Sequence, residues 1–264
     1  MRLSIVCVTR NDDYGFRMLD RFSAFLKCIP SNKELELIIV EWNPPDNRER
    51  LIDIVKRMEL GYLVRVVTVP NSVHRCGSFS FPVVEYWGKN VGLSYARGDW
   101  VLFLNPDVII PARIFEGIFK GSLNASAYYR AVRVDVKPEV LDMEGDIFEN
   151  CKQNIVKVNR REDAPFSNAS GDFLLLSADV AMDMRGYIQT EKIYTWLDTE
   201  FVERCYSKLG NLAIFDVPIY HVEHGRHDRK VNQYIMEQAR KDFKHNNGII
   251  GLDKTWLNVS SNME

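Results

Sequence analysis

The chain has no excess of positive charge and no long apolar run, and each absence removes a class of protein. Among its 264 residues Lys plus Arg number 34 and Asp plus Glu number 36, which gives a formal net charge of -2. Nucleic-acid-binding surfaces need a basic excess, so we expect no nucleic-acid partner. No apolar stretch reaches the roughly 20 residues that a membrane-spanning helix needs. We therefore expect a cytoplasmic protein, and peripheral association with the cytosolic face of a membrane stays open.

Cysteine is scarce, and its spacing indicates neither a metal site nor a disulfide framework. The five cysteines are an odd number, and no two of them have metal-ligand spacing: Cys7, Cys28, Cys76, Cys151 and Cys205. No secretory leader is visible, because Met1-Arg2 leads directly into a short apolar segment. Both observations suit a reducing compartment.

The first 110 residues show a regular alternation of strand and helix patterns. Short apolar runs predict buried strands over 3–8, 35–40, 63–69 and 100–104. Apolar residues at helical spacing predict helices over 16–29, about 46–60 and 86–97. Segment 70–82 contains Gly, Ser and Pro and has no clear period, which predicts a loop. This order indicates an α/β fold with a mixed, mostly parallel central sheet and helices on both faces.

The pattern becomes less regular after Pro111. Helices are expected over 112–120, 178–184, 197–209 and about 229–244, and strands over 127–136, 172–177 and 212–217. Residues 137–168 predict loops with a minor strand near 155–158, and the tail from Asn246 has little pattern. We expect both halves of the chain to pack on one sheet as a single domain.

Asn105-Pro106-Asp107 comes directly after the strand predicted at 100–104. Open α/β sheets bind ligands at the carboxyl ends of their strands. Asn105 offers a neutral amide oxygen and Asp107 an anionic oxygen, both suited to Mg²⁺ or Mn²⁺. A plain turn stabilised by an Asx side chain is the alternative.

Three segments resemble the GT-A glycosyltransferases, and in particular their family 2. The segments are LSIVCVTRN, ELIIVEWNP and GKNVGLSYARGDWVLFLNPDVIIP. The resemblance covers residues 3–112 and continues more thinly over 169–227. It implies a GT-A (Rossmann-like) single domain, in which residues 1–110 bind a nucleotide-sugar and residues 111–264, with the C-terminal helix and tail, bind an acceptor.

The same resemblance implies an activity. It is that of a hexosyl- or deoxyhexosyltransferase in glycan biosynthesis, dependent on Mn²⁺ or Mg²⁺. The enzyme would move a sugar with inversion from a UDP- or dTDP-sugar to a hydroxyl of a carbohydrate, glycolipid or glycoprotein.

The resemblance also assigns the nucleotide and metal side of the site. The first acid of the family's Asp-X-Asp motif is Asn105 here, so Asp107 is the stronger metal ligand and Asn105 a helper. His224 matches a histidine that completes the metal site in some members. The residues implied in nucleotide binding are Thr9, Arg10, Asn11, Glu41, Lys89, Asn90 and Asn105. The resemblance also places Asp99 on the nucleotide side of the pocket. Plain alternatives stay open: a solvent-facing acid for Glu41, a solvated lysine for Lys89, and a turn residue for Asp99.

On the acceptor side, Asp198 in Trp196-Leu197-Asp198-Thr199-Glu200 aligns with the family's general base. An inverting transfer needs one carboxylate to take the proton of the acceptor hydroxyl. The family's preceding Glu is Leu197 here, and Glu200 is a candidate replacement; helix capping is the ordinary role for Asp198. The implied substrate-binding residues are Asp172, Trp196, Glu200 and His221.

Two other functions stay open. A sugar nucleotidyltransferase has a similar order of elements, but the segment Thr9 to Asp12 lacks the glycine-rich phosphate loop of those enzymes. A non-catalytic carbohydrate- or nucleotide-binding relative is favoured by Asn105 and Leu197, which stand where the family has acids.

Overall fold

The structure is a computed structural model, and it describes residues 2–12, 16–77, 79, 81–159, 171–190, 197–225, 237, 241 and 257–263. The helix expected over 229–244 lies outside the described residues except for positions 237 and 241, both of which are helical. No helix in the described part combines the length and hydrophobicity needed to span a membrane.

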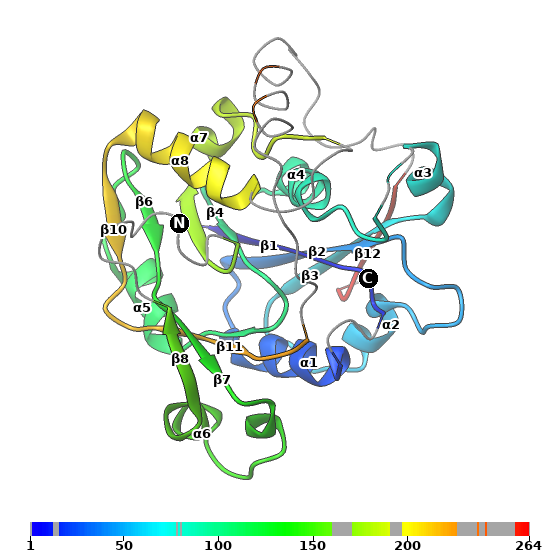
Figure 1. Cartoon of the computed structure of the whole chain (residues 1–264), viewed down its shortest axis with the longest axis horizontal. Helices are drawn as coiled ribbons and strands as arrows, with labels where there is room; N and C mark the ends of the chain where they lie inside the picture. The colour runs from blue at the N-terminus through cyan, green and yellow to red at the C-terminus, as the bar shows by residue number, and fades with distance from the viewer. Residues whose placement is uncertain are drawn as a thin grey trace.

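An eight-stranded mixed sheet forms the centre of the molecule (Figure 1). Strands β1, β2, β3 and β4 run parallel to their neighbours in the group, while β9 and β12 pair antiparallel with β4 and β3. The predicted mixed, mostly parallel sheet is therefore confirmed. In spatial order the strands are β10 (Leu212–Ile214), β6 (Tyr128–Arg130), β9 (Leu174–Ser177), β4 (Trp100–Phe103), β1 (Leu3–Thr9), β2 (Leu35–Trp42), β3 (Leu63–Val69) and β12 (Asn258–Ser261).

Helices cover both faces of this sheet because the side chains of each buried strand alternate between two apolar layers. On β1, Ile5 and Cys7 pack in one layer, whereas Val6 and Val8 pack in the other. The first layer is closed by α1 (Met18–Cys28), α2 (Leu51–Lys56) and α5 (Ala112–Lys120). The second is closed by α4 (Glu85–Tyr95), α7 (Ala178–Asp183) and α8 (Leu197–Leu209).

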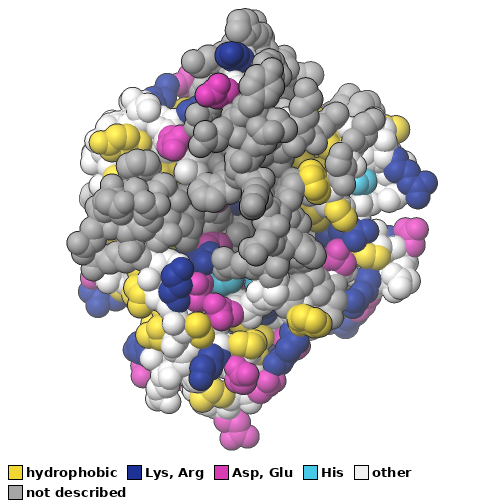
Figure 2. Space-filling view, in the orientation of Figure 1, with side chains coloured by type: hydrophobic (Ala, Val, Ile, Leu, Met, Phe, Trp, Pro, Cys, Tyr) yellow, Lys and Arg dark blue, Asp and Glu magenta, His cyan; other side chains and the backbone are white. Residues whose placement is uncertain are grey.

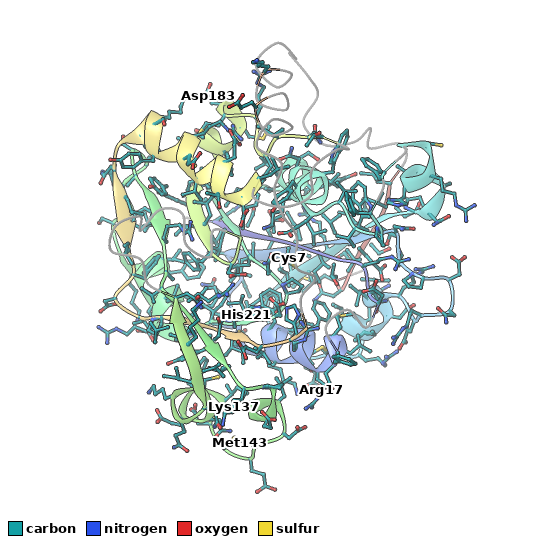
Figure 3. All side chains as sticks on the ribbon, in the orientation of Figure 1. Cys7, Arg17, Lys137, Met143, Asp183 and His221 are labelled. Carbon is teal, nitrogen blue, oxygen red and sulfur yellow. The ribbon has the colours of Figure 1, made fainter. Side chains whose placement is uncertain are left out.

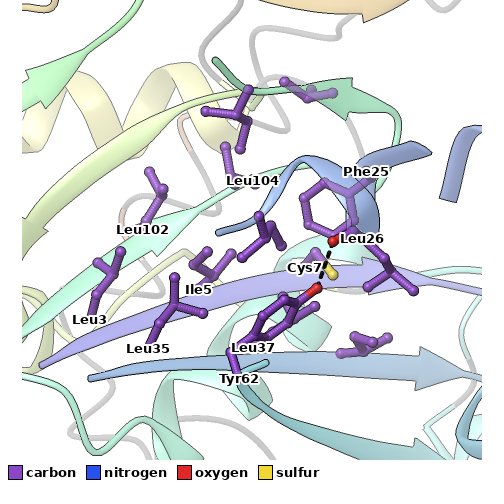
Figure 4. Packing of buried hydrophobic residues seen from close by; sticks show 14 of the residues in the cluster. Leu3, Ile5, Cys7, Phe25, Leu26, Leu35, Leu37, Tyr62, Leu102 and Leu104 are labelled. Atoms are coloured by element: carbon purple, nitrogen blue, oxygen red, sulfur yellow. Dashed lines mark hydrogen bonds between the residues drawn. The ribbon is translucent and has the colours of Figure 1, made fainter. Parts of the chain in front are cut away.

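Helix α1 is held in the first layer by buried aromatic and aliphatic side chains. Phe25 and Leu26 are fully buried, and the Tyr62 hydroxyl donates a hydrogen bond to the Leu26 carbonyl at 2.7 Å (Figure 4). Cys7 lies in the same cluster and is a free, buried thiol, as expected for a core cysteine. These contacts in the first apolar layer therefore fix α1 against the central sheet.

A second, four-stranded sheet has the order β5 (Val108–Ile109), β11 (Ile219–Val222), β7 (Arg133–Val136) and β8 (Ile155–Asn159). It projects from the central sheet together with a 3-10 turn, η1 (Pro138–Leu141), and α6 (Ile147–Gln153) (Figure 1). Asp146 caps α6 by accepting hydrogen bonds from the Phe148 and Glu149 N–H groups at 2.7 and 3.2 Å. This small sheet begins immediately after Asp107.

Several predicted elements were wrong in detail. Segment 70–82 contains a short helix, α3 (Asn71–Cys76), and the predicted strand 127–136 is two strands, β6 and β7, in different sheets. Residues 137–159 hold η1 and α6 besides the predicted minor strand, and the tail forms β12. The second helix begins at Leu51 and not near Asp46, because the Leu51 N–H donates to the buried Glu41 carboxylate at 3.1 Å.

Candidate functional site

Asp107 lies at the point where the two sheets meet. The chain leaves the central sheet after β4, passes Asp107 and enters the small sheet as β5. Strand β11 pairs with β5, which brings His221 close to Asp107. His224 follows two residues after the end of β11. Figure 3 labels His221, and Figure 2 shows histidine side chains in cyan near the middle of this face, with acidic and basic side chains beside them.

The Asp107 carboxylate and the two imidazoles form a compact set of possible ligands. Asp107 Oδ2 lies 3.0 Å from His224 Nε2 and 3.7 Å from His221 Nε2. One ligand atom from each residue lies within 4.8 Å of the others. Asp107 Oδ1 is buried and has no hydrogen-bond partner in the described part of the chain. A buried carboxylate oxygen normally has a partner, so this orphan atom fits a cation.

The charges around Asp107 keep it ionised. Burial alone would raise the pKa of Asp107, but His221, His224 and Arg21 outweigh burial and hold that pKa well below its ordinary value. Burial of His221 lowers its pKa, while Asp107 and Asp135 act in the other direction and leave it raised. The cluster therefore carries an anionic oxygen for a metal ion, and protons compete with that ion for His221.

Sequence reasoning missed Arg21, whose Nη1 lies 3.2 Å from Asp107 Oδ2. Arg21 is almost fully buried on α1, and its Nε also donates to the Phe16 carbonyl at 3.1 Å. An arginine inside an amphipathic helix gives no sign of which carboxylate it will meet, since that depends on how α1 packs. Arg21 therefore gives Asp107 a cationic neighbour even without a metal ion.

Asn105 is turned toward Asp172. Its amide donates to Asp172 Oδ1 at 2.8 Å, and Arg133 forms an ion pair with the other oxygen of Asp172. The fold thus brings together Asn105, assigned to the nucleotide side, and Asp172, assigned to the substrate side. Asn105 follows the carboxyl end of β4, and Asp172 precedes β9, the strand that pairs with β4.

Asp198 is the second residue of α8, inside the first turn and not in the cap position before it. The Tyr86 hydroxyl donates to Asp198 Oδ1 at 3.2 Å, a contact that the sequence gave no reason to expect. A Cβ atom added to Gly171 would lie 3.1 Å from Asp198 Oδ2 and 3.5 Å from the Asn105 amide nitrogen. Asp198 and Asn105 therefore both lie next to Gly171, with little space for a side chain at that position.

Lys89 is not a solvated lysine, because its side chain is completely buried. Its ammonium group donates to the Gly171 carbonyl at 3.1 Å and pairs with Glu85 at 2.6 Å. Its neighbour Asn90 donates to the Tyr187 carbonyl and accepts from the Tyr187 N–H, each at 2.8 Å. The pair therefore anchors α4 to the segments that carry Gly171 and Tyr187.

The predicted nucleotide-binding residues of the first loop meet at the ends of β1 and β2. Asn11, with a positive φ of 61°, donates to Glu41 Oε1 at 2.9 Å, and Arg10 Nε donates to the Asn43 carbonyl at 3.0 Å. Thr9 Oγ1 accepts a hydrogen bond from the Asn11 N–H at 3.4 Å. Glu41 is fully buried, so the alternative of a solvent-facing acid is wrong.

The remaining predicted residues lie in varied settings. Glu200 accepts two hydrogen bonds from Arg204 Nε at 2.8 and 3.0 Å along α8. Asp99 is a turn residue whose carboxylate accepts from the Arg2 N–H at 2.9 Å. Leu197, which stands where the resembling family has an acid, is buried in the apolar layer under α8. Trp196 lies outside the described residues.

Comparison with known proteins identifies the fold. No family model matches the chain, and no curated protein sequence matches it. Among solved structures, S. aureus TarS 1–349 aligns with 84% of this chain and 60% of its own length, at 16% identity and a TM-score of 0.52. TarS 1–349 in complex with UDP-GlcNAc aligns with 97% of this chain and 69% of its own, at 15% identity and a TM-score of 0.56.

A third structure, TarS 1–349 in complex with UDP, aligns with 97% of this chain and 68% of its own, at 14% identity and a TM-score of 0.52. The chain thus spans about 60 to 70% of these TarS structures. Their agreement with the central sheet and its helices shows that this chain has a GT-A-like α/β fold.

Proposed function

We propose that this chain is a metal-dependent glycosyltransferase that moves a sugar from a UDP- or dTDP-sugar to a hydroxyl group of a glycan or related acceptor. The observation that carries the proposal is the set of Asp107, His221 and His224 at the carboxyl end of β4. The set lies at the edge of a sheet where α/β proteins bind nucleotides. The fold is shared with TarS structures that contain UDP-GlcNAc or UDP, which supports a nucleotide-sugar donor.

His221, which the sequence suggested as a substrate contact, is better placed as a third metal ligand beside Asp107 and His224. Two imidazoles and one carboxylate suit Mn²⁺ better than Mg²⁺, because Mg²⁺ prefers oxygen ligands. When bound, the ion supplies positive charge for the diphosphate leaving group. The same ligand set also suits Zn²⁺ or Fe²⁺, so both belong in a binding screen.

The residues on the acceptor side would carry the proton transfer. Asp198 would take the proton of the attacking hydroxyl, and the Tyr86 hydroxyl holds one of its oxygens at 3.2 Å. Attack from the side opposite the diphosphate gives inversion at the sugar. Asn105 and Asp172, joined at 2.8 Å, would contact the donor sugar between the base and the metal ligands.

The donor's nucleotide would bind at the ends of β1 and β2, where Thr9, Arg10, Asn11 and Glu41 meet. Lys89 and Asn90 would support the site indirectly, because their hydrogen bonds hold the segments around Gly171 and Tyr187 in place. In this proposal residues 1–110 supply the nucleotide-sugar half of the domain and residues 111–264 the acceptor half, with Glu200 and Trp196 on the acceptor side.

Thermal-shift screening with UDP, dTDP and GDP sugars, each with and without Mn²⁺, tests donor binding because a ligand of the native state raises apparent stability. We expect a metal-dependent rise with one nucleotide class. Transfer or hydrolysis of that donor should then be abolished in Asp198→Asn, with nucleotide binding nearly intact. Full activity of Asp198→Asn would contradict the assignment of the base.

A non-catalytic carbohydrate- or nucleotide-binding protein is the second candidate, favoured by Asn105 and by the buried Leu197. It predicts metal-independent nucleotide binding and no turnover in the same assay. The sugar nucleotidyltransferase has less support, since the loop from Thr9 to Asp12 contains no glycine.

A further inference from the structure

In the small sheet, the side chains of Asp135 and His221 lie in a row that ends at Asp107. In the parallel pairing of β11 with β7, His221 stands directly opposite Asp135. In the antiparallel pairing of β11 with β5, the same His221 stands opposite Val108, the residue after Asp107. Directly opposed residues project from the same face of a sheet. The register therefore places Asp135 behind His221, on the side away from Asp107.

Both ring nitrogens of His221 have a carboxylate neighbour. Nδ1 lies 3.1 Å from Asp135 Oδ1, and Nε2 lies 3.7 Å from Asp107 Oδ2. His221 and Asp135 are each only 3% exposed, so water does not compete for these atoms. Neither His221 Nδ1 nor Asp135 Oδ1 has an aligned hydrogen-bond partner in the described part of the chain. Buried polar atoms normally have a partner, and these two lie 3.1 Å apart, so a small rotation of the ring would pair them.

Asp135 is itself in contact with two other side chains, Arg133 and Asn159. Arg133 Nε lies 2.9 Å from Oδ1, and the Asn159 amide donates to Oδ2 at 2.7 Å. Arg133 Nη2 also donates to Oδ2, at 3.3 Å. Oδ2 thus accepts the hydrogen bonds, whereas Oδ1 lies near Arg133 Nε without an aligned hydrogen bond and faces His221.

We propose that Asp135 is the positioning residue that holds His221 in the tautomer with the proton on Nδ1, so that the Nε2 lone pair faces Asp107 and accepts the metal ion. The inference rests on the proposed function, which makes His221 a ligand. An ionised carboxylate only accepts hydrogen bonds, so a neutral His221 beside Asp135 carries its proton on Nδ1. Ligand histidines in general depend on such a partner at their other nitrogen.

Asp135→Asn tests this assignment with little change in volume. Its amide keeps one oxygen and gains one NH2 group. At the Oδ2 position the NH2 group would face two donors, Asn159 Nδ2 and Arg133 Nη2. At the Oδ1 position it would face one donor, Arg133 Nε, and His221 Nδ1, which can accept in its other tautomer. The orientation that points the NH2 group at His221 therefore keeps more hydrogen bonds. The His221 proton would then move to Nε2 and block the metal position.

Two measurements apply to the purified full chain. Nitrogen-15 NMR of the histidine rings, at a pH where His221 is neutral and without metal, reports which nitrogen is protonated; His221→Gln identifies the signal. We expect Nδ1–H in the wild type and Nε2–H in Asp135→Asn. Electron paramagnetic resonance of free Mn²⁺ then gives the dissociation constant, which should rise about 10- to 100-fold in Asp135→Asn.

Glu36→Gln is the matched control, because Glu36 is also a buried strand carboxylate and pairs with Arg65 at 2.9 Å. It should leave both readouts unchanged. An Nε2–H tautomer in the wild type, or Mn²⁺ affinity in folded Asp135→Asn within twofold of wild type, would overturn the inference. The wild-type spectrum decides the question even if Asp135→Asn does not fold. Absence of Mn²⁺ binding by a wild type with the Nδ1–H tautomer would contradict the proposed metal role and leave the assignment of the tautomer supported.

Discussion

Asp107 has three basic side chains beside it, and this makes its charge the first quantity to test. His224, His221 and Arg21 all lie within 3.7 Å of its Oδ2 atom. Asp107→Asn keeps the shape and removes the charge. We expect Mn²⁺ affinity to fall at least about 100-fold, since even outer partners of metal ligands are worth 10- to 100-fold. Isothermal titration with Mn²⁺ measures this, and Asp142→Asn, at an exposed partner of Arg17, is the control. Equal affinities in wild type and Asp107→Asn would contradict the metal site.

Gly171 provides a second test at the scale of one residue. An alanine Cβ would stand 3.1 Å from Asp198 Oδ2 and 3.5 Å from the Asn105 amide, close enough to displace one of them. Displacements of about 1 Å in a catalytic group cost up to about 100-fold in rate. We expect Gly171→Ala to lower kcat at least about tenfold with little change in Tm. Gly117→Ala, which would meet only the Phe215 ring, should keep normal kcat. An equal kcat in both variants would contradict a catalytic role for the groups beside Gly171.

Residues that lie at the ends of strands were within reach of sequence reasoning, because strand ends converge at one edge of a sheet. Asp107 was predicted in this way, whereas His224 was implied only by the family resemblance, and the fold brings the two to 3.0 Å. Arg21, Tyr86 and Asp135 were not predicted, since their contacts depend on helix packing and on strand register. The single available signal was Asp135 itself, an acid between Val134 and Val136 in an apolar strand. Whether Thr9, Arg10 or Glu41 binds a nucleotide stays a prediction.

At the scale of elements, the main error was to treat residues 127–136 as one strand. The alternating pattern is real, but β6 belongs to the central sheet and β7 to the small sheet. Both sheets impose the same period of two, so alternation alone does not show where a chain passes from one sheet to the other. The boundary matters for the site, because β7 carries Arg133 and Asp135 on the strand next to His221.

Strand β12 is an element that the sequence pattern did not reveal, and it covers the outer edge of β3. Four of its residues pair antiparallel with β3, and the Asn262 side chain accepts from the Val64 N–H at 2.8 Å. Ending the chain at residue 256 would remove these contacts and leave an open strand edge. At about 1 kcal/mol for each lost hydrogen bond, we expect Tm to fall by about 5–10 °C and the protein to self-associate.

Differential scanning calorimetry and light scattering measure the two effects of this truncation. The variant Val259→Ala of the 264-residue chain, at a half-exposed position of β12, should keep the oligomeric state of the wild type and a Tm close to it. A truncated chain that melts with the wild type would show that β12 adds nothing to the stability of the sheet.

For the whole molecule, the α/β class and the mostly parallel sheet could be predicted because four short apolar runs alternate with segments of helical period. The attachment of a second sheet could not, since its strands come from four separate segments and are two to five residues long. That second sheet supplies His221, so the site is assembled by the tertiary structure and not by one motif.

The charge of this site should also be visible in the stability of the whole protein. The raised pKa of His221 means that its proton stabilises the folded state fully below its unfolded pKa of about 6.5, and that this contribution is lost as pH rises through the folded pKa. His74, whose pKa is lowered by burial and by Arg10, has the opposite sign and loses stability as pH falls. The low pKa of Asp107 affects stability only in acid, outside this window. Comparison with His221→Gln separates the His221 contribution, since His74 is the same in both proteins.

We therefore expect the Tm of the wild type, relative to His221→Gln, to fall as the pH rises above about 6.5 in EDTA, by about 2–4 °C for each kcal/mol of lost stabilisation. Mn²⁺ should reverse the trend, because the ion needs the neutral ring and binds more tightly as the proton leaves. Its stabilising effect should grow with pH in the wild type and be small in His221→Gln. A Tm difference in EDTA that stays flat or widens toward high pH would contradict the raised pKa of His221, whereas a Mn²⁺ effect that is equal in the two proteins would show that His221 is not a ligand.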